Sequence, residues 1–393
     1  MSDADHIRLL RAGAGVWNSW RSDFPDVRPD LSLGPLSRLD MRGANLSRCN
    51  LSGAHLNSAD LGGADLTRAN VSGASMIRAQ LQNCSLTSAN LAGANLTNAV
   101  FTEAVLSYAD LRSVHGAHLN MRSATLVGAN LSRGSFYEAD LQFADLRASK
   151  LLWANLTRIN LTGATMRRCD LTGVSLIDAE ACDVDFRGSN LTYSRIIDSR
   201  IDRADLSESR IYGISAWNVV SDNAVQADLI ISPPDEPKIT VDNLEVAQFV
   251  YVLLHSPAVR GAIMTLTSKV VLILGRFTPE RMKVLQAIRS ALRLRGHLPI
   301  VFDFSALPTR DLTETISTLA HLSRFIIADL TDARSVPHEL MAVVPNLPSV
   351  PVQPLLLAGQ AEYGMFEHFR LYPWVLSTWM YEARRGHSGN SVR

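Results

Sequence analysis

Several polar residues that could take part in chemistry follow one apolar segment, FIIADLTDARSVPHEL, at residues 325 to 340. Asp329 and Asp332 lie where the apolar run ends, and Glu339 begins the next expected helix. A carboxylate placed beside a developing positive charge can stabilise that charge or attack as a nucleophile. A glutamate in the first turn of a helix is also favoured by the helix dipole. The segment therefore predicts either a catalytic Glu339 or an ordinary helix start.

A second group of polar residues follows two other apolar segments. Gly275 and Arg276 come directly after KVVLIL, and Asp303 ends the segment LPIVFD. An arginine at a helix start can bind a phosphate group. We therefore predict a binding site for a nucleotide-like anion. Its residues are Gly275, Arg276, Thr278, Asp303, Asp332 and Ser335.

Alternating strands and helices must position these residues. The segments that end at Gly275, Asp303 and Asp329 are apolar throughout, and amphipathic helical patterns separate them. This alternation indicates an α/β doubly wound domain, with a parallel sheet covered on both faces. In such sheets ligands bind beyond the carboxyl ends of the strands. A fourth segment, PLLL, is expected at a sheet edge or a strand start because Pro354 cannot donate a backbone hydrogen bond.

The run from VVLILGRF to ADLTDARSVPHEL resembles TIR-type domains and, more loosely, nucleoside 2-deoxyribosyltransferases. In both families a glutamate on the helix after such a loop acts at the anomeric carbon while an N-glycosidic bond breaks. By position that glutamate is Glu339, and Asp329 could orient a ribose hydroxyl. Ser335 agrees with the serine of the TIR motif, whereas Pro337 and His338 replace the usual aromatic and cysteine residues. The resemblance implies a flavodoxin-like or TIR-like sheet and, as one alternative, an enzyme that cleaves NAD or a nucleoside.

The first half of the chain has a strict period of five residues. Stepping by five from Leu36 to Ile211 visits 36 positions, and all but Gly116 and Ala181 are Leu, Ile, Val, Met or Phe. The residue two places before each of these centres is usually Ala, as at Ala59. Neither the helix period of 3.6 nor the strand period of two keeps such a pattern on one face. The chain must therefore coil with a pitch that is a multiple of five.

Units such as ADLGG at 59–63 and CDLTG at 169–173 resemble the pentapeptide-repeat family. Members of that family form a right-handed quadrilateral parallel β-helix with four pentads in each coil. The resemblance therefore implies about nine coils here. The central Leu, Met and Phe residues would fill the interior, and the small residue two places earlier would fit beside them. Because such a solenoid is stabilised coil on coil, its ends need covering.

The expected domains follow the limits of the repeat. The three prolines of SPPDEPK favour an extended, exposed linker. The full layout resembles a group of bacterial pentapeptide-repeat proteins, through VWNSWR, ITVDNLEVAQF, VVLILGRF and VPVQPLL. We expect a helical cap at 1–33, the β-helix at 34–213, a closing segment and linker at 214–240, and the α/β TIR-like domain at 241–393.

Irregular positions within the repeat carry their own predictions. Gly116 and Ala181 would leave the interior underfilled, which predicts a bulge, a bend or a compensating neighbour. Three cysteines take the small inward position: Cys49, Cys84 and Cys169. Together with Cys182 they form no CxxC pair and no cluster with the spacing of metal ligands. We therefore expect reduced structural thiols and no metal.

The charge balance bears on the type of partner. The chain has 38 basic and 38 acidic residues, so it has no strong field to attract nucleic acid or an anionic membrane. Some pentapeptide-repeat proteins resemble duplex DNA and bind type II topoisomerases, which requires a strongly acidic surface. Residues 34–213 hold 18 basic and 17 acidic residues, a balance that does not favour DNA mimicry. Topoisomerase binding is the second alternative.

The leading prediction is a bacterial cytoplasmic interaction or signalling protein. No apolar run is long enough for a membrane span, and MSDADHIRLLRAGAG has no long apolar core like that of a signal peptide. The solenoid would present a binding surface, and the C-terminal domain would bind a nucleotide-like ligand or a protein partner. No cofactor is required, and NAD or another nucleotide is the candidate ligand. We also consider a homo-oligomer, and expect no direct binding to nucleic acid or membrane.

Overall fold

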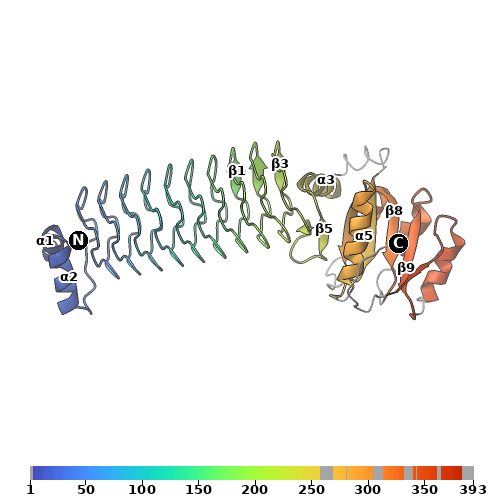
Figure 1. Cartoon of the computed structure of the whole chain (residues 1–393), viewed down its shortest axis with the longest axis horizontal. Helices are drawn as coiled ribbons and strands as arrows, with labels where there is room; N and C mark the ends of the chain where they lie inside the picture. The colour runs from blue at the N-terminus through green and yellow to red at the C-terminus, as the bar shows by residue number, and fades with distance from the viewer. Residues whose placement is uncertain are drawn as a thin grey trace, which may run out of the picture. The chain divides into compact units, whose positions relative to one another are not determined.

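The computed structural model describes residues 3–256, 269–279, 281–303, 313–331, 340–341, 343–360 and 364–382 (Figure 1). The chain divides into two compact units, Met1–Leu229 (unit 1) and Ile230–Arg393 (unit 2). Among the residues described, no helix is both long and apolar enough to cross a membrane.

Unit 1 is a β-solenoid that advances by one coil every twenty residues. Parallel bridges join each residue at a bridging position to the residue twenty places on, from Asp30 with Asn50 to Asp205 with Val225. Four such columns of bridges run through the unit because every fifth residue takes part. Near the end the bridges lengthen into three parallel strands: β1 (Ser175–Ile177), β2 (Arg195–Ile197) and β3 (Ser215–Trp217). The predicted β-helix is confirmed.

One pentad shows how five residues turn a corner. The Cys49 N–H donates to the Leu46 carbonyl at 3.1 Å, which closes a four-residue turn. Arg48 occupies its third position with φ of +58°, a left-handed conformation that costs about 1–2 kcal/mol for an L-residue. The Asn45 side chain accepts from the Ser47 N–H at 3.2 Å and stabilises the approach to the turn. This bond explains why Asn or Asp so often precedes the central residue.

Backbone hydrogen bonds then join each pentad to the neighbouring coils. The Leu46 N–H donates to the Asp65 carbonyl at 2.7 Å, and the Arg48 N–H donates to the Thr67 carbonyl at 2.9 Å. The Asp65 N–H donates back to the Ala44 carbonyl at 3.0 Å. Because each corner residue from Leu33 to Glu208 is bonded to the next coil in this way, the conformational cost is offset in these pentads.

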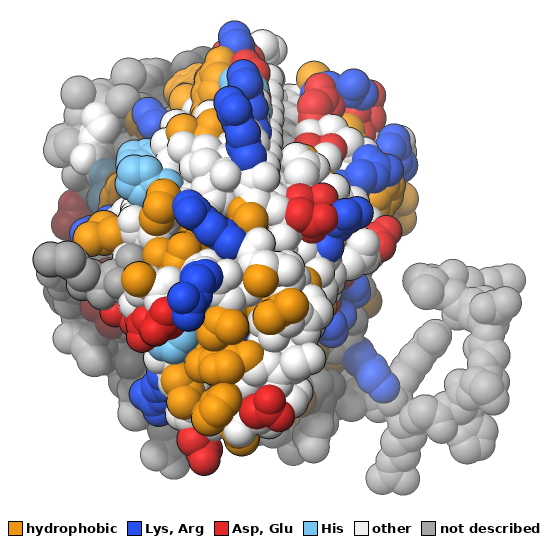
Figure 2. Space-filling view, turned by 90° about the vertical axis from the view of Figure 1, so that its left-hand side faces the viewer, with side chains coloured by type: hydrophobic (Ala, Val, Ile, Leu, Met, Phe, Trp, Pro, Cys, Tyr) orange, Lys and Arg blue, Asp and Glu red, His pale blue; other side chains and the backbone are white. Residues whose placement is uncertain are grey.

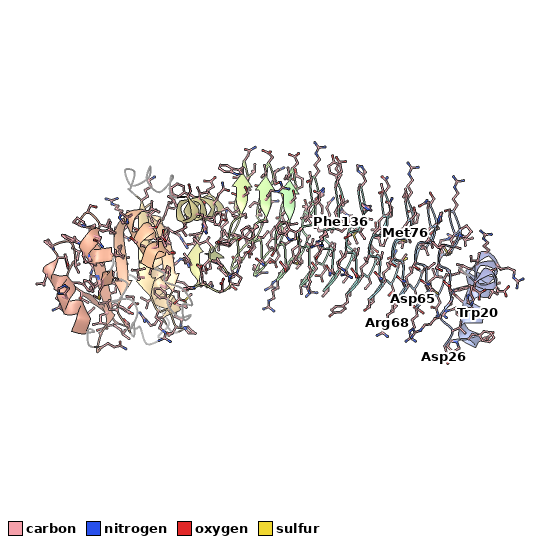
Figure 3. All side chains as sticks on the ribbon, turned by 180° about the vertical axis from the view of Figure 1, so that it is seen from behind. Trp20, Asp26, Asp65, Arg68, Met76 and Phe136 are labelled. Atoms are coloured by element: carbon pink, nitrogen blue, oxygen red, sulfur yellow. The ribbon has the colours of Figure 1, made fainter. Side chains whose placement is uncertain are left out.

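The interior consists of the central residues and the small residues two places before them. Met76 and Phe136, both labelled in Figure 3, are central residues with no exposed surface. Ala59 and Ala94 represent the small inward position and are likewise fully buried. Large and small apolar residues therefore alternate around each coil and fill the core.

Gly116, an irregular centre, is compensated by a neighbour in the next coil. A Cβ atom added to Gly116 would lie 3.2 Å from Cδ1 of Phe136 and 3.1 Å from Cδ2 of Leu119. The same phenyl ring is even closer to Gly134, where an added Cβ would lie 2.5 Å from its Cε2. The ring thus takes up the room that both glycines leave. Ala181, the other irregular centre, is 1% exposed and keeps its coil-to-coil hydrogen bond, with its N–H 2.8 Å from the Arg200 carbonyl.

Two helices cover the first coil, α1 (Ala4–Arg11) and α2 (Ala14–Asp23). The fully buried Trp17 donates its indole N–H to the Asn45 carbonyl at 2.8 Å, and Arg21 donates to the Ser47 carbonyl at 2.9 Å. Figure 2 shows that hydrophobic side chains gather beside charged ones at this end. The exposed hydrophobic residues here include Val16, Phe24, Val27 and Leu33.

The coils continue beyond residue 213, where the repeat pattern of the sequence ends. Bridges join Arg200 to Val220 and Asp205 to Val225, and left-handed corners recur up to Asp228. The central positions of this last coil are Ala216, Ser221 and Gln226, which are small or polar. Backbone pairing with the preceding coil is therefore enough to form a further coil, even without large apolar residues at its central positions.

Unit 2 contains a seven-stranded mixed sheet in the order β10-β9-β8-β6-β7-β5-β4. The strands are β4 (Leu229–Ile230), β5 (Ile239–Val241), β6 (Val270–Gly275), β7 (Leu298–Asp303), β8 (Ser323–Asp329), β9 (Val352–Leu357) and β10 (Trp379–Tyr381). Strands β6 to β10 are parallel, whereas β5 is antiparallel to β7, so the sheet is not parallel throughout as expected.

Helices accompany this sheet, and both faces of its central strand β6 are buried. They are α3 (Leu244–His255), α5 (Met282–Leu294) and α6 (Thr313–His321), with the 3-10 helices η1 (Val344–Asn346) and η2 (Gly364–Leu371). Helix α5 packs Leu285 and Leu292 against Val271 and Ile273 of β6. The intervening Leu272 of β6 is also fully buried, and α6 packs against β8 and α3.

Pro354 lies inside β9 and not at a sheet edge, which corrects the sequence-based expectation. It pairs with Ala328 of β8 on one side, and β10 lies on the other. The register with β10 shifts by one residue at this point, from Val352 with Val375 to Leu355 with Trp379. A proline has no N–H to donate to β10. It is tolerated here because the register with β10 shifts at this position.

All four cysteines of unit 1 are free and buried. Burial raises the pKa of the Cys49 and Cys84 thiols to about 12 and that of Cys169 to about 11. Burial also raises the pKa of Cys182. Because only the thiolate reacts readily, these thiols should be inert in the folded chain.

The contact between Gly134 and Phe136 can be tested with a double-mutant cycle. Gly134→Ala should destabilise unit 1 by about 1–3 kcal/mol, because the new methyl group meets the phenyl ring. Phe136→Leu removes that ring, so the glycine substitution should cost much less in the double variant. Urea unfolding followed by circular dichroism would measure the coupling. Strictly additive effects would contradict this packing.

Thiol accessibility gives a second test of the solenoid interior. At pH 8 the native chain should react with Ellman's reagent far more slowly than free cysteine does, and urea should release all four thiols. The reason is that burial raises the pKa of all four thiols and so lowers the fraction of reactive thiolate at pH 8. Rapid reaction of one or more thiols in the native chain would contradict the burial described.

Candidate functional site

Strand register brings the carboxyl ends of β6, β7 and β8 together in unit 2. Gly275 pairs with Asp303, and Leu274 pairs with Ala328, the residue before Asp329. Gly275 and Asp329 are buried, while Asp303 is partly exposed. Three of the residues singled out in the sequence therefore lie at the same edge of the sheet.

Asp329 forms a buried ion pair with Arg281, which precedes α5. The Nη2 group of Arg281 donates to Oδ2 of Asp329, and the two residues are 8% and 3% exposed. Nη1 of Arg281 also donates to the Thr331 carbonyl at 2.6 Å and to the Arg276 carbonyl at 2.9 Å. Removing one partner of a buried pair typically costs about 3–5 kcal/mol. In this arrangement the Asp329 carboxylate holds the strand-end loops together.

Tyr381 of β10 completes this buried cluster. Its hydroxyl donates to Oδ2 of Asp329 at 3.2 Å and accepts from Nη2 of Arg281 at 3.3 Å. The Thr331 hydroxyl lies 3.2 Å from the hydroxyl oxygen of Tyr381 and accepts from the Leu357 N–H at 3.0 Å. Burial raises the pKa of Tyr381, so the phenol stays neutral and can donate. The cluster thus joins β8, β9 and β10 at their carboxyl ends.

Sequence analysis did not identify Arg281, Thr331 or Tyr381 as members of a site. Thr331 had a local signal, because its N–H donates to Oδ1 of Asp329 two residues earlier, at 3.0 Å. Arg281 lies 48 residues from Asp329 and Tyr381 lies 52 residues from it, so no spacing in the sequence links them. Only the strand order of the sheet brings them together.

Gly275 provides room for the Phe277 ring. A Cβ atom at Gly275 would lie 2.6 Å from Cζ of Phe277, which is 6% exposed. The Phe277 N–H donates to Oδ1 of Asp303 at 3.1 Å. Gly275 and Asp303 together shape the turn after β6 and leave the Arg276 side chain exposed.

The remaining predicted residues divide into two groups. Thr278 is partly exposed, and its carbonyl accepts from the N–H groups of Arg281 and Met282 at 2.9 and 3.1 Å. Helix α5 therefore begins at Met282. Glu339, Asp332 and Ser335 lie outside the described residues.

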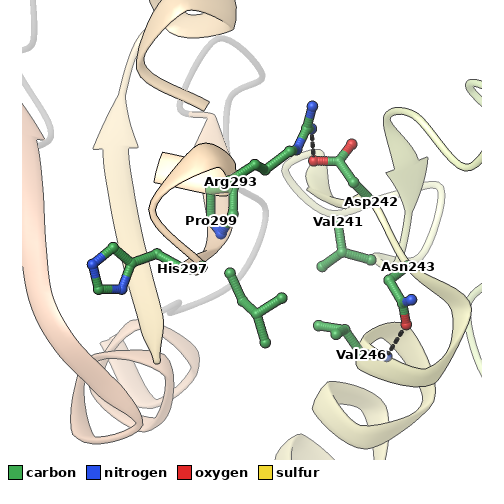
Figure 4. A pocket seen from close by; sticks show the side chains of 9 residues that line it. Val241, Asp242, Asn243, Val246, Arg293, His297 and Pro299 are labelled. Carbon is green, nitrogen blue, oxygen red and sulfur yellow. Dashed lines mark hydrogen bonds and ion pairs between the residues drawn. The ribbon is translucent and has the colours of Figure 1, made fainter. Parts of the chain in front are cut away.

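A separate pocket of about 300 Å³ lies at the opposite end of β7 (Figure 4). Leu298 and Pro299, at the start of that strand, form part of its wall, with Val241 and Asn243 across from them. The other lining residues are Asp242, Val246, Arg293, Gly296 and His297. Asp242 forms ion pairs with Arg289 and Arg293 of α5, which fixes this wall. No residue singled out in the sequence lines this pocket.

Unit 1 has two surface grooves on its coils. One, of about 410 Å³, is lined by Arg21, Arg48 and Arg68 together with Asp65 and neighbouring hydroxyl groups. The other, of about 630 Å³, includes Arg133, Lys150 and Trp153. Within the described residues, no group of His, Cys, Asp or Glu side chains is arranged to hold a metal ion.

Exposed aromatic rings on the coils rest against glycines of the next coil. Tyr108, Phe143 and Trp153 are 67%, 53% and 58% exposed. A Cβ atom at the glycine twenty residues later would lie 2.7, 2.6 and 2.3 Å from the respective rings. Those glycines are Gly128, Gly163 and Gly173, all at left-handed corners. Each ring therefore packs against a glycine of the next coil, where any side chain would displace it.

Comparison with known proteins bears on unit 1. The family model described as pentapeptide repeats matches residues 36–73, 44–83, 79–115, 118–151, 154–192 and 169–208. No curated protein matches the chain significantly.

Several solved structures are similar to part of the chain. HetL, a pentapeptide repeat protein of the cyanobacterium Nostoc sp. strain PCC 7120, is 24% identical; the match covers 54% of this chain and 95% of HetL, with a TM-score of 0.28. Full-length QnrB1, a plasmid-mediated fluoroquinolone resistance protein, is 19% identical over 42% of this chain and 92% of its own, with a TM-score of 0.25. A thylakoid-lumen pentapeptide repeat protein of Arabidopsis thaliana is 18% identical over 37% and 73%, with a TM-score of 0.14.

The five-residue units, the twenty-residue coil and the family model agree on one assignment. Residues 36–208 therefore contain pentapeptide repeats.

Proposed function

We propose that this chain is an interaction protein in which unit 1 presents a preformed binding surface and unit 2 binds a nucleotide-like ligand. One observation supports the role of unit 1 most directly: Tyr108, Phe143 and Trp153 are exposed yet rest on glycines of the adjoining coil. Aromatic residues are enriched in protein interfaces. Rings already held in one position lose little conformational freedom on binding.

The architecture of unit 1 favours binding over chemistry. Its coils repeat one backbone geometry, and several of its arginines form ion pairs with nearby aspartates, as Arg147 does with Asp145 and Arg187 with Asp185. Such pairs neutralise charge without leaving a reactive group poised for proton transfer. The surface therefore has shape and aromatic contacts to offer to a partner.

The topology of unit 2 supports the proposed ligand site. Numbered along the chain, its five parallel strands lie in the order 2-1-3-4-5, which is typical of flavodoxin-like doubly wound sheets. Ligands of such sheets bind beyond the carboxyl ends of the strands. At that edge Arg276 is exposed, while Asp329 and Arg281 are paired with each other. Among the residues described at that edge, Arg276 is therefore a cation available to bind a phosphate group.

Ring placement on unit 1 is testable through the glycine beneath Trp153. Gly173→Ala should displace the indole ring and reduce retention of protein partners from a bacterial lysate, measured by quantitative mass spectrometry with the immobilised full chain. Gly73→Ala is the matched control, because Gly73 also has positive φ but no atom lies within 4 Å of an added Cβ. Equal retention by the wild-type chain and both variants, or no specific retention, would contradict the role of unit 1.

The ligand site of unit 2 can be tested with NAD, ADP-ribose, AMP and GTP. At least one should bind the full chain in isothermal titration calorimetry, and Arg276→Ala should weaken that binding about tenfold by removing a charge-assisted hydrogen bond. Stability should not change, since only the Arg276 carbonyl takes part in the buried cluster. Arg324→Ala is the control, because Arg324 is exposed at the amino end of β8. Equal losses of nucleotide affinity in the Arg276 and Arg324 variants would contradict a ligand site at Arg276.

A further inference from the structure

We propose that the groove containing Arg133, Lys150 and Trp153 binds an extended acidic segment of a protein partner. This inference rests on the proposed role of unit 1 as a binding surface and adds the chemical class of the partner. It follows from three features of the groove: two cations without a carboxylate partner, an exposed indole ring held by the next coil, and a backbone that is already fully paired.

The groove runs along one side of several successive coils. Its volume is about 630 Å³, and its lining passes from Gly93 through Ser113 and Arg133 to Trp153, each twenty residues after the last. At about 4.8 Å between coils, these three steps span roughly 14 Å, enough for four or five residues of extended chain. The other lining residues are Ala92, Arg112, Asn130, Ser132, Lys150, Leu152 and Asp170.

Arg133 and Lys150 are the cations that this groove offers to a partner. Both are exposed, and no carboxylate of the described residues lies within ion-pairing distance of either. Arg112, by contrast, pairs with Asp110 at 2.6 Å. The groove carboxylate, Asp170, accepts from the Thr172 N–H and hydroxyl at 3.2 and 2.6 Å. Counting Asp170 and the pair of Arg112 with Asp110, the groove carries one positive charge in excess.

Several other arginines of the solenoid do have a carboxylate partner. The coil geometry readily supplies partners, either two residues before an arginine, as for Arg187 and Asp185, or twenty residues away, as for Arg203 and Asp183. Both arrangements give N–O distances of 2.6 Å. The residue two places before Arg133 is the buried Leu131, and the residue twenty places after it is Trp153. An acidic side chain from outside would supply the missing partner.

Trp153 provides the apolar part of the binding surface. Its ring is 58% exposed, and carbon atoms of the indole would lie 2.3 to 2.5 Å from a Cβ added to Gly173. Tryptophan and arginine are the residues that most often dominate interface energies. The indole ring therefore offers a fixed apolar contact next to the two free cations.

The backbone of the groove excludes recognition by strand addition. The Leu131 N–H donates to the Lys150 carbonyl at 2.7 Å, and the Arg133 N–H donates to the Leu152 carbonyl at 2.8 Å. With its main-chain groups paired coil to coil, this side of the solenoid has no free strand edge for a peptide to extend. A partner must be recognised by its side chains. Two free cations suit a short acidic segment better than the continuous phosphate charge of a nucleic acid.

A fluorescent peptide with the sequence Glu-Ser-Glu-Leu repeated three times is a suitable probe. Its binding to the full chain would be measured by anisotropy at low salt, beside the same peptide with Lys in place of Glu and a twelve-nucleotide oligothymidylate. We expect only the acidic peptide to bind, more weakly as salt rises. No binding of the acidic peptide, or tighter binding of the oligonucleotide, would overturn the proposal.

Charge reversal locates the binding site. Arg133→Glu combined with Lys150→Glu should weaken binding of the acidic peptide at least tenfold, and Trp153→Ala should weaken it severalfold. Arg38→Glu combined with Arg78→Glu is the matched control, because both arginines are exposed at left-handed corners like Arg133. The control should change the affinity less than twofold. Equal weakening in both double variants would show that the acidic peptide does not bind in this groove. The proposed role of unit 1 would remain, since lysate retention tests that role separately.

Discussion

The coil-to-coil hydrogen bond is the constraint on which the structure of unit 1 depends. Corner residues from Leu33 to Glu208 offset the cost of their left-handed conformation by donating an N–H to a carbonyl of the next coil, as Arg48 does to Thr67 at 2.9 Å. Once the backbone is paired in this way, the interior needs only one large and one small residue in each pentad. The outward positions are free to vary, so any specificity of unit 1 must come from its exposed side chains.

The sequence predicted the coil because its period is set by this interior packing. It also predicted a bulge, a bend or a compensating neighbour at Gly116, and the Phe136 ring is such a neighbour. The end of the coils could not be predicted in the same way. Residues 214–228 keep the backbone pairing, but their central residues include Ser221 and Gln226. The five-residue apolar pattern therefore ends one coil before the β-helix does.

In unit 2 the sequence predicted which residues end the strands but not which side chains bind one another. Gly275, Asp303 and Asp329 lie at one edge of the sheet because each ends an apolar strand and these strands are parallel. The pairing of Asp329 with Arg281 and Tyr381 depends on strand order, which local patterns do not encode. Pro354 was misplaced for a related reason, since a register shift toward β10 admits a proline inside the sheet.

The proposed function implies that the chain binds its partners without converting them. The most direct test is mass-spectrometric analysis of NAD and other nucleotides incubated at high concentration with the wild-type chain and with Glu339→Gln, under conditions that permit assembly. We predict that every nucleotide is recovered intact from both proteins. Release of free base by the wild-type chain alone would contradict this view and identify Glu339 as a catalytic residue.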